Sequence, residues 1–381
     1  MGNTLTGLIP DIYAALDVVS RELVGFIPAV SLDASAEQVE LNQTLRVPVA
    51  PGNSSAGNIT PAMSLPAAAD QSFAGSPTLT ITKQRFAPFS WSGEEQKGVE
   101  KGPGFLTLQQ GQIAQAIRAL VNEMETDLAA GIYKGASRAW GTAGTTPFAS
   151  DLSDPANIKK ILDDNGAPQT DRSLVIDTTA GVKMRSLTQL TNVNQAGSNE
   201  GLRRGVLLPL HGMDIRESGQ VQLVTKGTAA TWSTDAAGYA KGATVLTIAG
   251  GTGAFNVGDV VTIAGDTANK YVVAGSDATH LTLNAPGLMQ AIPAAAKAIT
   301  VGGNFTANVA FSRNAVLLAA RIPRSPMEGD LAIDRMVVTD PISGISFEFS
   351  IYPGYRMVVY HVSACWGLSV LKPEHMAILL G

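Results

Sequence analysis

The stretch FLTLQQGQIAQAIRALVNEMETDLAAGIYKGAS, residues 105–137, decides the fold. Apolar residues recur in it at helical spacing, namely Leu108, Ile113, Ile117, Leu120, Val121, Met124, Leu128 and Ile132. Pro103 and Gly104 precede the stretch, Thr107 with Gln110 matches a capping box, and Gly135 is a stop signal. A helix of about 28 residues is roughly 40 Å long, which exceeds the width of an ordinary small domain. We therefore predict a long helix that supports the rest of the chain.

Composition narrows the class of protein. The chain has 381 residues, 45% of them apolar and 15% charged, and a net charge of −5. These values predict two or three domains with a sizeable core and exclude a disordered polypeptide. The sequence contains no basic patch of the kind that neutralises phosphates, so it does not favour tight nucleic-acid binding.

Targeting and redox signals are sparse. Cys365 is the single cysteine, so we expect no internal disulfide, a reducing environment and an apolar core position for this residue. We also expect neither a secretory signal peptide nor a membrane span, because no sufficiently long apolar run occurs.

Extended segments and loops dominate the chain before the long helix. A short amphipathic helix is predicted after Pro10, either as a core helix or as an arm laid on an adjacent subunit. Residues 41–51 are strand-like but contain two prolines, and alternation resumes from Leu79 to Arg85. The intervening residues 52–77 are rich in Gly, Ser, Ala and Pro. Together they predict a two-stranded excursion with a long loop, typical of a binding element or a disordered insert.

The chain after the helix is predicted to be mixed. A helix from Asp154 to Gly166, a buried strand at residues 172–178 and a helix from Thr179 indicate an α/β region. Five short alternating runs between residues 226 and 303 indicate a small β-barrel or sandwich inserted into that region. Residues 308–323 are predicted to be helix-like, and the rest of the chain to be a meander of strands.

No constellation of residues indicates catalysis. The four histidines lack metal-ligand spacing, and adjacent carboxylates such as Asp163 and Asp164 point apart. The glycine-rich run at residues 250–259 lacks the lysine of a phosphate loop, and no nucleophile elbow occurs. We therefore predict a protein that is not an enzyme, with no catalytic residue, cofactor or metal.

The order of these elements resembles the major capsid proteins of tailed phages with the Hong Kong 97-type fold. The segments HGMDIRESGQVQLVTKGTAATW and NFTANVAFSRNAVLLAARIP resemble the entry to and exit from an inserted β-barrel in one subfamily, and CWGLSVLKPEHMAILLG resembles the closing strand. The resemblance covers nearly the whole chain and implies an α+β fold. It implies an N-terminal arm at 1–40, an E-loop and stem at 41–103, the spine helix of the P-domain at 104–150 and an A-domain at 151–225. The insertion domain would be 226–303, and residues 304–381 would complete the A- and P-domains.

The resemblance also implies a function. The chain would self-assemble into pentamers and hexamers of an icosahedral shell around double-stranded DNA, in the virion capsid after assembly in the host cytoplasm. Its partners would be other copies of itself, a scaffolding protein, a portal and possible decoration proteins, with only non-specific contact to DNA and none to a membrane. The alternatives are the shell of a bacterial nanocompartment of the same fold and a β-rich protein that is not a capsid.

Charged residues on the stem and the helix are the candidate subunit-interface residues. Lys83 and Arg85 are predicted to meet carboxylates of a neighbouring subunit, such as those of the long helix. The complete set is Arg46, Lys83, Arg85, Glu94, Glu95, Arg118, Glu123, Glu125 and Asp127.

Overall fold

The computed structural model describes residues 24–47, 77–99, 105–192, 205, 207, 209–326, 329–339 and 344–381. The predicted helix after Pro10 lies outside the described residues except at its end, where residues 24–30 form a loop and a turn. Most of the predicted loop, residues 52–76, also lies outside them.

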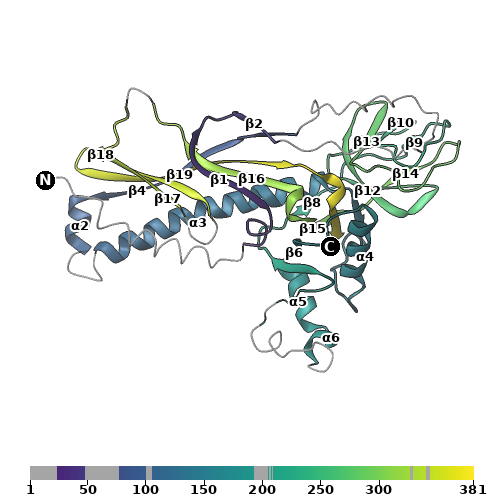
Figure 1. The fold of residues 1–381 in the computed structure, drawn as a ribbon, viewed down its shortest axis with the longest axis horizontal. Helices are drawn as coiled ribbons and strands as arrows, with labels where there is room; N and C mark the ends of the chain where they lie inside the picture. The colour runs from purple at the N-terminus through teal and green to yellow at the C-terminus, as the bar shows by residue number, and fades with distance from the viewer. Residues whose placement is uncertain are drawn as a thin grey trace, which may run out of the picture.

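The long helix α3 spans Phe105–Ile132 and runs along the long axis of the molecule (Figure 1). Its 28 residues match the predicted length, and a short 3-10 turn, Tyr133–Gly135, ends it as predicted. The capping prediction was wrong, because the helix begins at Phe105 and Thr107 therefore lies inside it. The apolar stripe packs into the largest core cluster, where Ile113, Met124 and Leu128 are fully buried.

A six-stranded sheet lies along α3 (Figure 1). Its path is β1 (Ser31–Val39), β16 (Val316–Pro323), β19 (Met357–Val370), β18 (Ser346–Gly354) and β17 (Asp334–Thr339), with β4 (Lys83–Ser92) also paired to β19. Only the β1–β16 pairing in this sheet is parallel. Helix and sheet approach closely where Gly131 faces Leu368, since a Cβ on that glycine would lie 2.9 Å from the leucine side chain.

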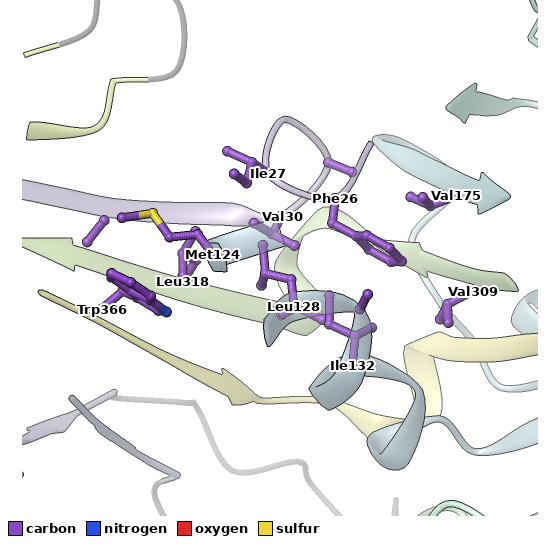
Figure 2. Packing of buried hydrophobic residues seen from close by; sticks show 14 of the residues in the cluster. Phe26, Ile27, Val30, Met124, Leu128, Ile132, Val175, Val309, Leu318 and Trp366 are labelled. Carbon is purple, nitrogen blue, oxygen red and sulfur yellow. The ribbon is translucent and has the colours of Figure 1, made fainter. Parts of the chain in front are cut away.

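Apolar side chains from several parts of the chain meet around the second half of α3. Figure 2 shows Phe26 and Val30 from the N-terminal turn, Met124, Leu128 and Ile132 from the helix, and Leu318 and Trp366 from the sheet. Burial of apolar surface contributes about 25 cal/mol per Å², so this cluster stabilises the packing of the helix against the sheet.

The predicted two-stranded stem is present at its base. Strand β2 (Thr44–Arg46) pairs antiparallel with β3 (Thr78–Thr80). The base of this hairpin buries Val39, Leu79 and Ile81 against Ala319 and Cys365 of the sheet. It crosses β19 at Gly367, where an added Cβ would lie only 2.1 Å from the carbonyl oxygen of Thr80.

The second sheet has twelve strands. Its path is β7 (Met213–Glu217), β6 (Arg172–Ile176), β15 (Phe305–Ser312), β20 (Met376–Leu380), β5 (Arg138–Trp140), β12 (Asp266–Ser276), β13 (His280–Leu283), β10 (Val245–Ala249) and β9 (Ser233–Thr234), with β8 (Leu223–Val224), β11 (Val260–Ile263) and β14 (Ile299–Val301) attached. The other helices are α2 (Gly93–Val99), α4 (Ser153–Asp164), α5 (Thr178–Ser186) and α6 (Thr188–Thr191). The α+β class predicted from the sequence is confirmed.

All five runs predicted as strands between residues 226 and 303 are strands: β10, β11, β12, β13 and β14. Pairing runs from β14 through β11, β12, β13 and β10 to β9, and the bridge between Ser233 and Ala298 links the ends of this path. These strands enclose a cluster of their own around Tyr271 and Val261. They also continue the larger sheet, because Lys270 and Tyr271 pair with β5.

The helix predicted at residues 308–323 was wrong. This segment forms most of β15, the 3-10 turn Arg313–Ala315 and β16, which lie in different sheets. Both strands are buried along nearly their whole length, so both of their faces are covered and mostly apolar. A continuous apolar run of this kind has no period that separates a strand from a helix.

Candidate functional site

The described residues offer little for chemistry. No group of three or more His, Cys, Asp and Glu side chains within them is arranged to hold a metal ion. Burial raises the pKa of the Cys365 thiol to about 12, so this group is not a nucleophile at neutral pH. Among the described helices, none has the length and apolar character that would let it cross a membrane.

Strand β4 follows β3 of the stem, and charged side chains bind it to α3. The Lys83 ammonium donates to Glu123 Oε1 at 3.0 Å and to Asp127 Oδ1 at 2.7 Å. Arg85 Nε donates to the same Glu123 oxygen at 3.0 Å, and the Trp366 indole donates to Asp127 Oδ2 at 2.8 Å. Because Glu123 and Asp127 are four residues apart on the helix, one ammonium reaches both.

This pairing shifts the pKa values of Lys83 and Glu123. Desolvation opposes the charge on Lys83, but hydrogen bonds to Asp127 and Glu123 outweigh it and raise its pKa. Desolvation likewise opposes the charge on Glu123, but hydrogen bonds from Lys83 and Arg85 outweigh it and lower its pKa. From the sequence we expected these partners in a neighbouring subunit, whereas the structure pairs them within one chain. A role for the same residues between subunits stays a prediction.

Glu125 does not belong to the exposed charged side of the helix, and that expectation was wrong. The residue is 1% exposed. Its Oε1 accepts hydrogen bonds from the backbone N–H groups of Gly25 at 2.7 Å and Phe26 at 2.8 Å and from the Ser218 hydroxyl at 2.8 Å, and its Oε2 accepts from Ile27 N–H at 3.1 Å. The carboxylate therefore binds the backbone N–H groups of the turn at residues 25–27.

The remaining candidates lie apart from this network. Arg46 is exposed at the end of β2, and Arg118 is exposed on α3. Glu95 and Ser92 form a capping box at the start of α2, in which the Ser92 N–H donates to Glu95 Oε2 at 2.8 Å and the Glu95 N–H donates to Ser92 Oγ at 3.3 Å. The Glu94 side chain is 90% exposed and lies 4.0 Å from Arg356. The structure thus brings Lys83, Arg85, Glu123 and Asp127 together in one network.

Large apolar side chains that the sequence analysis missed are exposed on the six-stranded sheet and its connections. Phe86 on β4 is 59% exposed, Tyr355 in the β18–β19 turn 93%, and Leu331 and Ile333 before β17 are 82% and 65% exposed. Phe86 stacks on His361 with 4.8 Å between ring centroids. Large exposed apolar side chains such as these are candidates for contacts with another protein chain. The alternation along β4 contained the signal, because Phe86 faces away from α3 while Lys83 and Arg85 face it.

The chain is similar in fold to solved capsid and particle structures. The match with a capsid chain of cyanophage P-SCSP1u covers 92% of this chain and 86% of that chain, with 14% identity and a TM-score of 0.49. For a chain of Mycobacterium phage Che8 the coverage is 80% and 72%, with 15% identity and a TM-score of 0.42. For a virus-like particle from Pyrococcus furiosus it is 97% and 98%, with 10% identity and a TM-score of 0.43. No family model and no curated protein matches the chain.

Proposed function

We propose that this chain is the major capsid protein of a tailed phage, a non-enzymatic subunit that self-assembles into an icosahedral shell around double-stranded DNA. The observation that carries the proposal is the long helix with the stem strand β4 fastened along it by Lys83 and Arg85. This arrangement fixes the direction of β4, which follows residues 48–76 and β3 in the chain. A strand whose direction is fixed next to a long Gly-, Ser-, Ala- and Pro-rich segment is suited to contacts with other copies.

The exposed apolar residues support the same proposal. Phe86, Leu331, Ile333 and Tyr355 lie on the sheet and its connections, away from the A-domain and insertion regions inferred from the sequence. A shell repeats each modest contact by symmetry, so such side chains are buried many times in the assembly. The net charge of −5 suits an inner wall that faces packaged DNA without binding it tightly.

We further propose a division of the chain into five regions. Residues 1–40 are the arm, 41–103 the E-loop and stem, 104–150 the spine helix of the P-domain, 151–225 the A-domain and 226–303 the insertion domain. The partners are further copies in pentamers and hexamers, a scaffolding protein and a portal. Assembly takes place in the host cytoplasm, and the protein then resides in the virion.

Deletion of residues 53–71 tests whether the loop drives assembly. The full-length chain is expected to form multimers of many subunits in sedimentation velocity, and the deletion variant to remain small while keeping its circular dichroism spectrum. Normal multimers from the deletion variant would contradict the role of the loop. Multimers that enclose an enzyme and no DNA in the native source would favour the nanocompartment alternative.

A further inference from the structure

The face of the six-stranded sheet that points away from α3 has a hollow of about 210 Å³, lined by β4, β17, β18, β19 and residues 323–326 and 330. Phe347 and Phe349 are buried in the core cluster on the α3 side, so Glu348 between them points to the opposite face. The strand register places Glu348 opposite Ser363 and Ser363 opposite Phe86. Neighbouring strands lie about 4.8 Å apart, so about 10 Å separates Glu348 from Phe86, with only a small serine between them. The gap has room for one inserted side chain.

Aromatic rings line one side of this hollow. The ring of His361 lies 4.8 Å from that of Phe86 and 4.8 Å from that of Tyr352, measured between centroids. Burial lowers the pKa of His361, so this ring is neutral at pH 7 and adds no positive charge. The face of an aromatic ring attracts a cation, and the planar guanidinium of arginine stacks on it. The lining therefore favours a cationic side chain.

The charges of the hollow do not balance. Each arginine of the lining pairs with a carboxylate of this chain, in the pairs Arg85–Glu123, Arg324–Glu40 and Arg335–Asp330. The charge of Glu348 acts on Arg335 as well, so one cation faces two carboxylates. One negative charge in the lining is therefore left without a cation of its own among the described residues.

Glu348 carries this charge in a buried position. Its side chain is part of a residue only 7% exposed, and it forms no ion pair with any residue that the structure describes. The Ser350 hydroxyl donates to Oε1 at 3.0 Å, whereas Oε2 accepts no hydrogen bond within the same ranges. A buried carboxylate is costly unless a cation pairs with it. An added guanidinium would bind Oε2 and leave the bond from Ser350 in place.

Exposed apolar side chains beside the hollow favour a protein as the source of this cation. Phe86 forms part of the lining, and Leu331 and Ile333 lie in the chain between Asp330 and Arg335, which also line it. Phe86, Leu331 and Ile333 are all largely exposed. A free cation would leave these side chains in water, whereas a protein surface that inserts one arginine would cover them too.

We infer that this hollow is an arginine-binding site between subunits: an exposed arginine of a second copy of the chain places its guanidinium between the Glu348 carboxylate and the Phe86 ring. The inference rests on the proposed shell function and names one contact of the shell. A shell presents the same surfaces of one chain to every copy, so a second copy is the occupant. Arg46 and Arg356 are examples of exposed arginines in the described ranges.

Binding of a soluble arginine analogue tests the site on the full-length chain. N-acetyl-arginine amide is titrated in saturation-transfer difference NMR, and N-acetyl-norleucine amide is the uncharged control. We expect a dissociation constant on the order of millimolar for the arginine analogue and no saturable binding of the control. Glu348→Gln removes the charge at nearly constant volume and should weaken binding about tenfold, as the loss of a charged hydrogen bond predicts. Asp214→Asn, which removes an exposed carboxylate on β7, should bind as the wild type does.

Sedimentation velocity tests whether the occupant is a second copy. Glu348→Gln is expected to form fewer multimers than the wild type, and Asp214→Asn as many. N-acetyl-arginine amide at several times its dissociation constant should reduce wild-type multimers more than sodium chloride of equal ionic strength does. Phe86→Leu covers the case in which Glu348→Gln fails to fold, because Phe86 is exposed. This variant removes only the ring and should weaken binding of the analogue several-fold.

Two results would overturn the inference. One is equal affinity for the arginine analogue in the wild type and in a folded variant of Glu348 or Phe86. The other is weakened binding with multimers as abundant as those of the wild type, which would make the hollow a site for a free cation. A wild-type chain that forms no multimers would instead contradict the shell function itself and, with it, a second copy as the occupant.

Discussion

Two faces of α3 carry glutamates two residues apart that behave differently. Glu123 lies on the flank of the helix, its side chain is 32% exposed, and it pairs with Lys83 and Arg85 of the stem. Glu125 is 1% exposed and accepts hydrogen bonds from the backbone. The difference teaches that charge along this helix has two uses. On the flank it sets the register of a strand, and on the buried face it fixes the course of the chain.

Charge reversal should give the largest difference in the free energy of unfolding between substitutions on the two faces. Glu125→Lys places an ammonium among buried N–H groups, so we expect a loss of about 3–5 kcal/mol in the free energy of unfolding, comparable to the breaking of a buried ion pair. Urea unfolding followed by circular dichroism measures this loss. Glu123→Lys is the matched control, and we expect it to lose about 1 kcal/mol. Equal losses in the two variants would mean that the faces do not differ.

A substitution at Asp127 should reduce the free energy of unfolding by an amount between those two losses. Asp127 pairs with the partly exposed ammonium of Lys83 and with the buried indole of Trp366. We expect Asp127→Ala to cost about 1–2 kcal/mol, since the indole N–H loses its acceptor. The same unfolding measurement applies, with tryptophan fluorescence as a local probe. An unfolding free energy equal to that of the wild type would show that the indole bond contributes nothing.

The stem pairing should depend on pH within a defined window. The pKa of Glu123 is lowered in the folded state, so its contribution is present above the ordinary glutamate value and is lost as pH falls through the lowered value. The pKa of Lys83 is raised, so its contribution is present below the ordinary lysine value and is lost as pH rises through the raised one. The stability difference between wild type and Glu123→Gln should therefore be largest between about pH 5 and 10 and shrink on both sides.

The stability difference between the wild type and Glu123→Gln is expected to be smaller than the losses for Glu125→Lys and Asp127→Ala, because the charges are partly solvated and salt screens them. Raising the ionic strength should reduce it further. A difference that stays constant from acid to alkaline pH would contradict the pairing of these groups.

The sequence predicted those parts of the fold whose pattern is local. The long helix, the buried strand β6 and the five strands between residues 226 and 303 each show a clear period or a run bounded by turns. The segment at residues 308–323 shows neither, because β15 and β16 are buried on both faces, and its prediction failed. The pairing of β4 with β19 joins residues more than 250 positions apart, so no local pattern could reveal it.

Of the candidate site, the sequence predicted the charged residues on the exposed flank of the helix and on the stem, but not their contacts. Lys83, Arg85, Glu123 and Asp127 were identified as charged residues of stem and helix, but their partners within the chain depend on the fold. Glu125 was misassigned although a signal was present. It follows Val121 by four residues and precedes Leu128 by three, so it falls on the apolar stripe and not on the charged side. A glutamate on such a stripe should be expected to accept buried hydrogen bonds.

Negative-stain electron microscopy of the purified full-length chain over a range of concentrations tests the shell proposal most directly. The account predicts closed hollow particles, or rings of five and six subunits where a scaffolding partner is required for closure. A preparation that contains only monomers, with neither rings nor shells at any concentration, would contradict it.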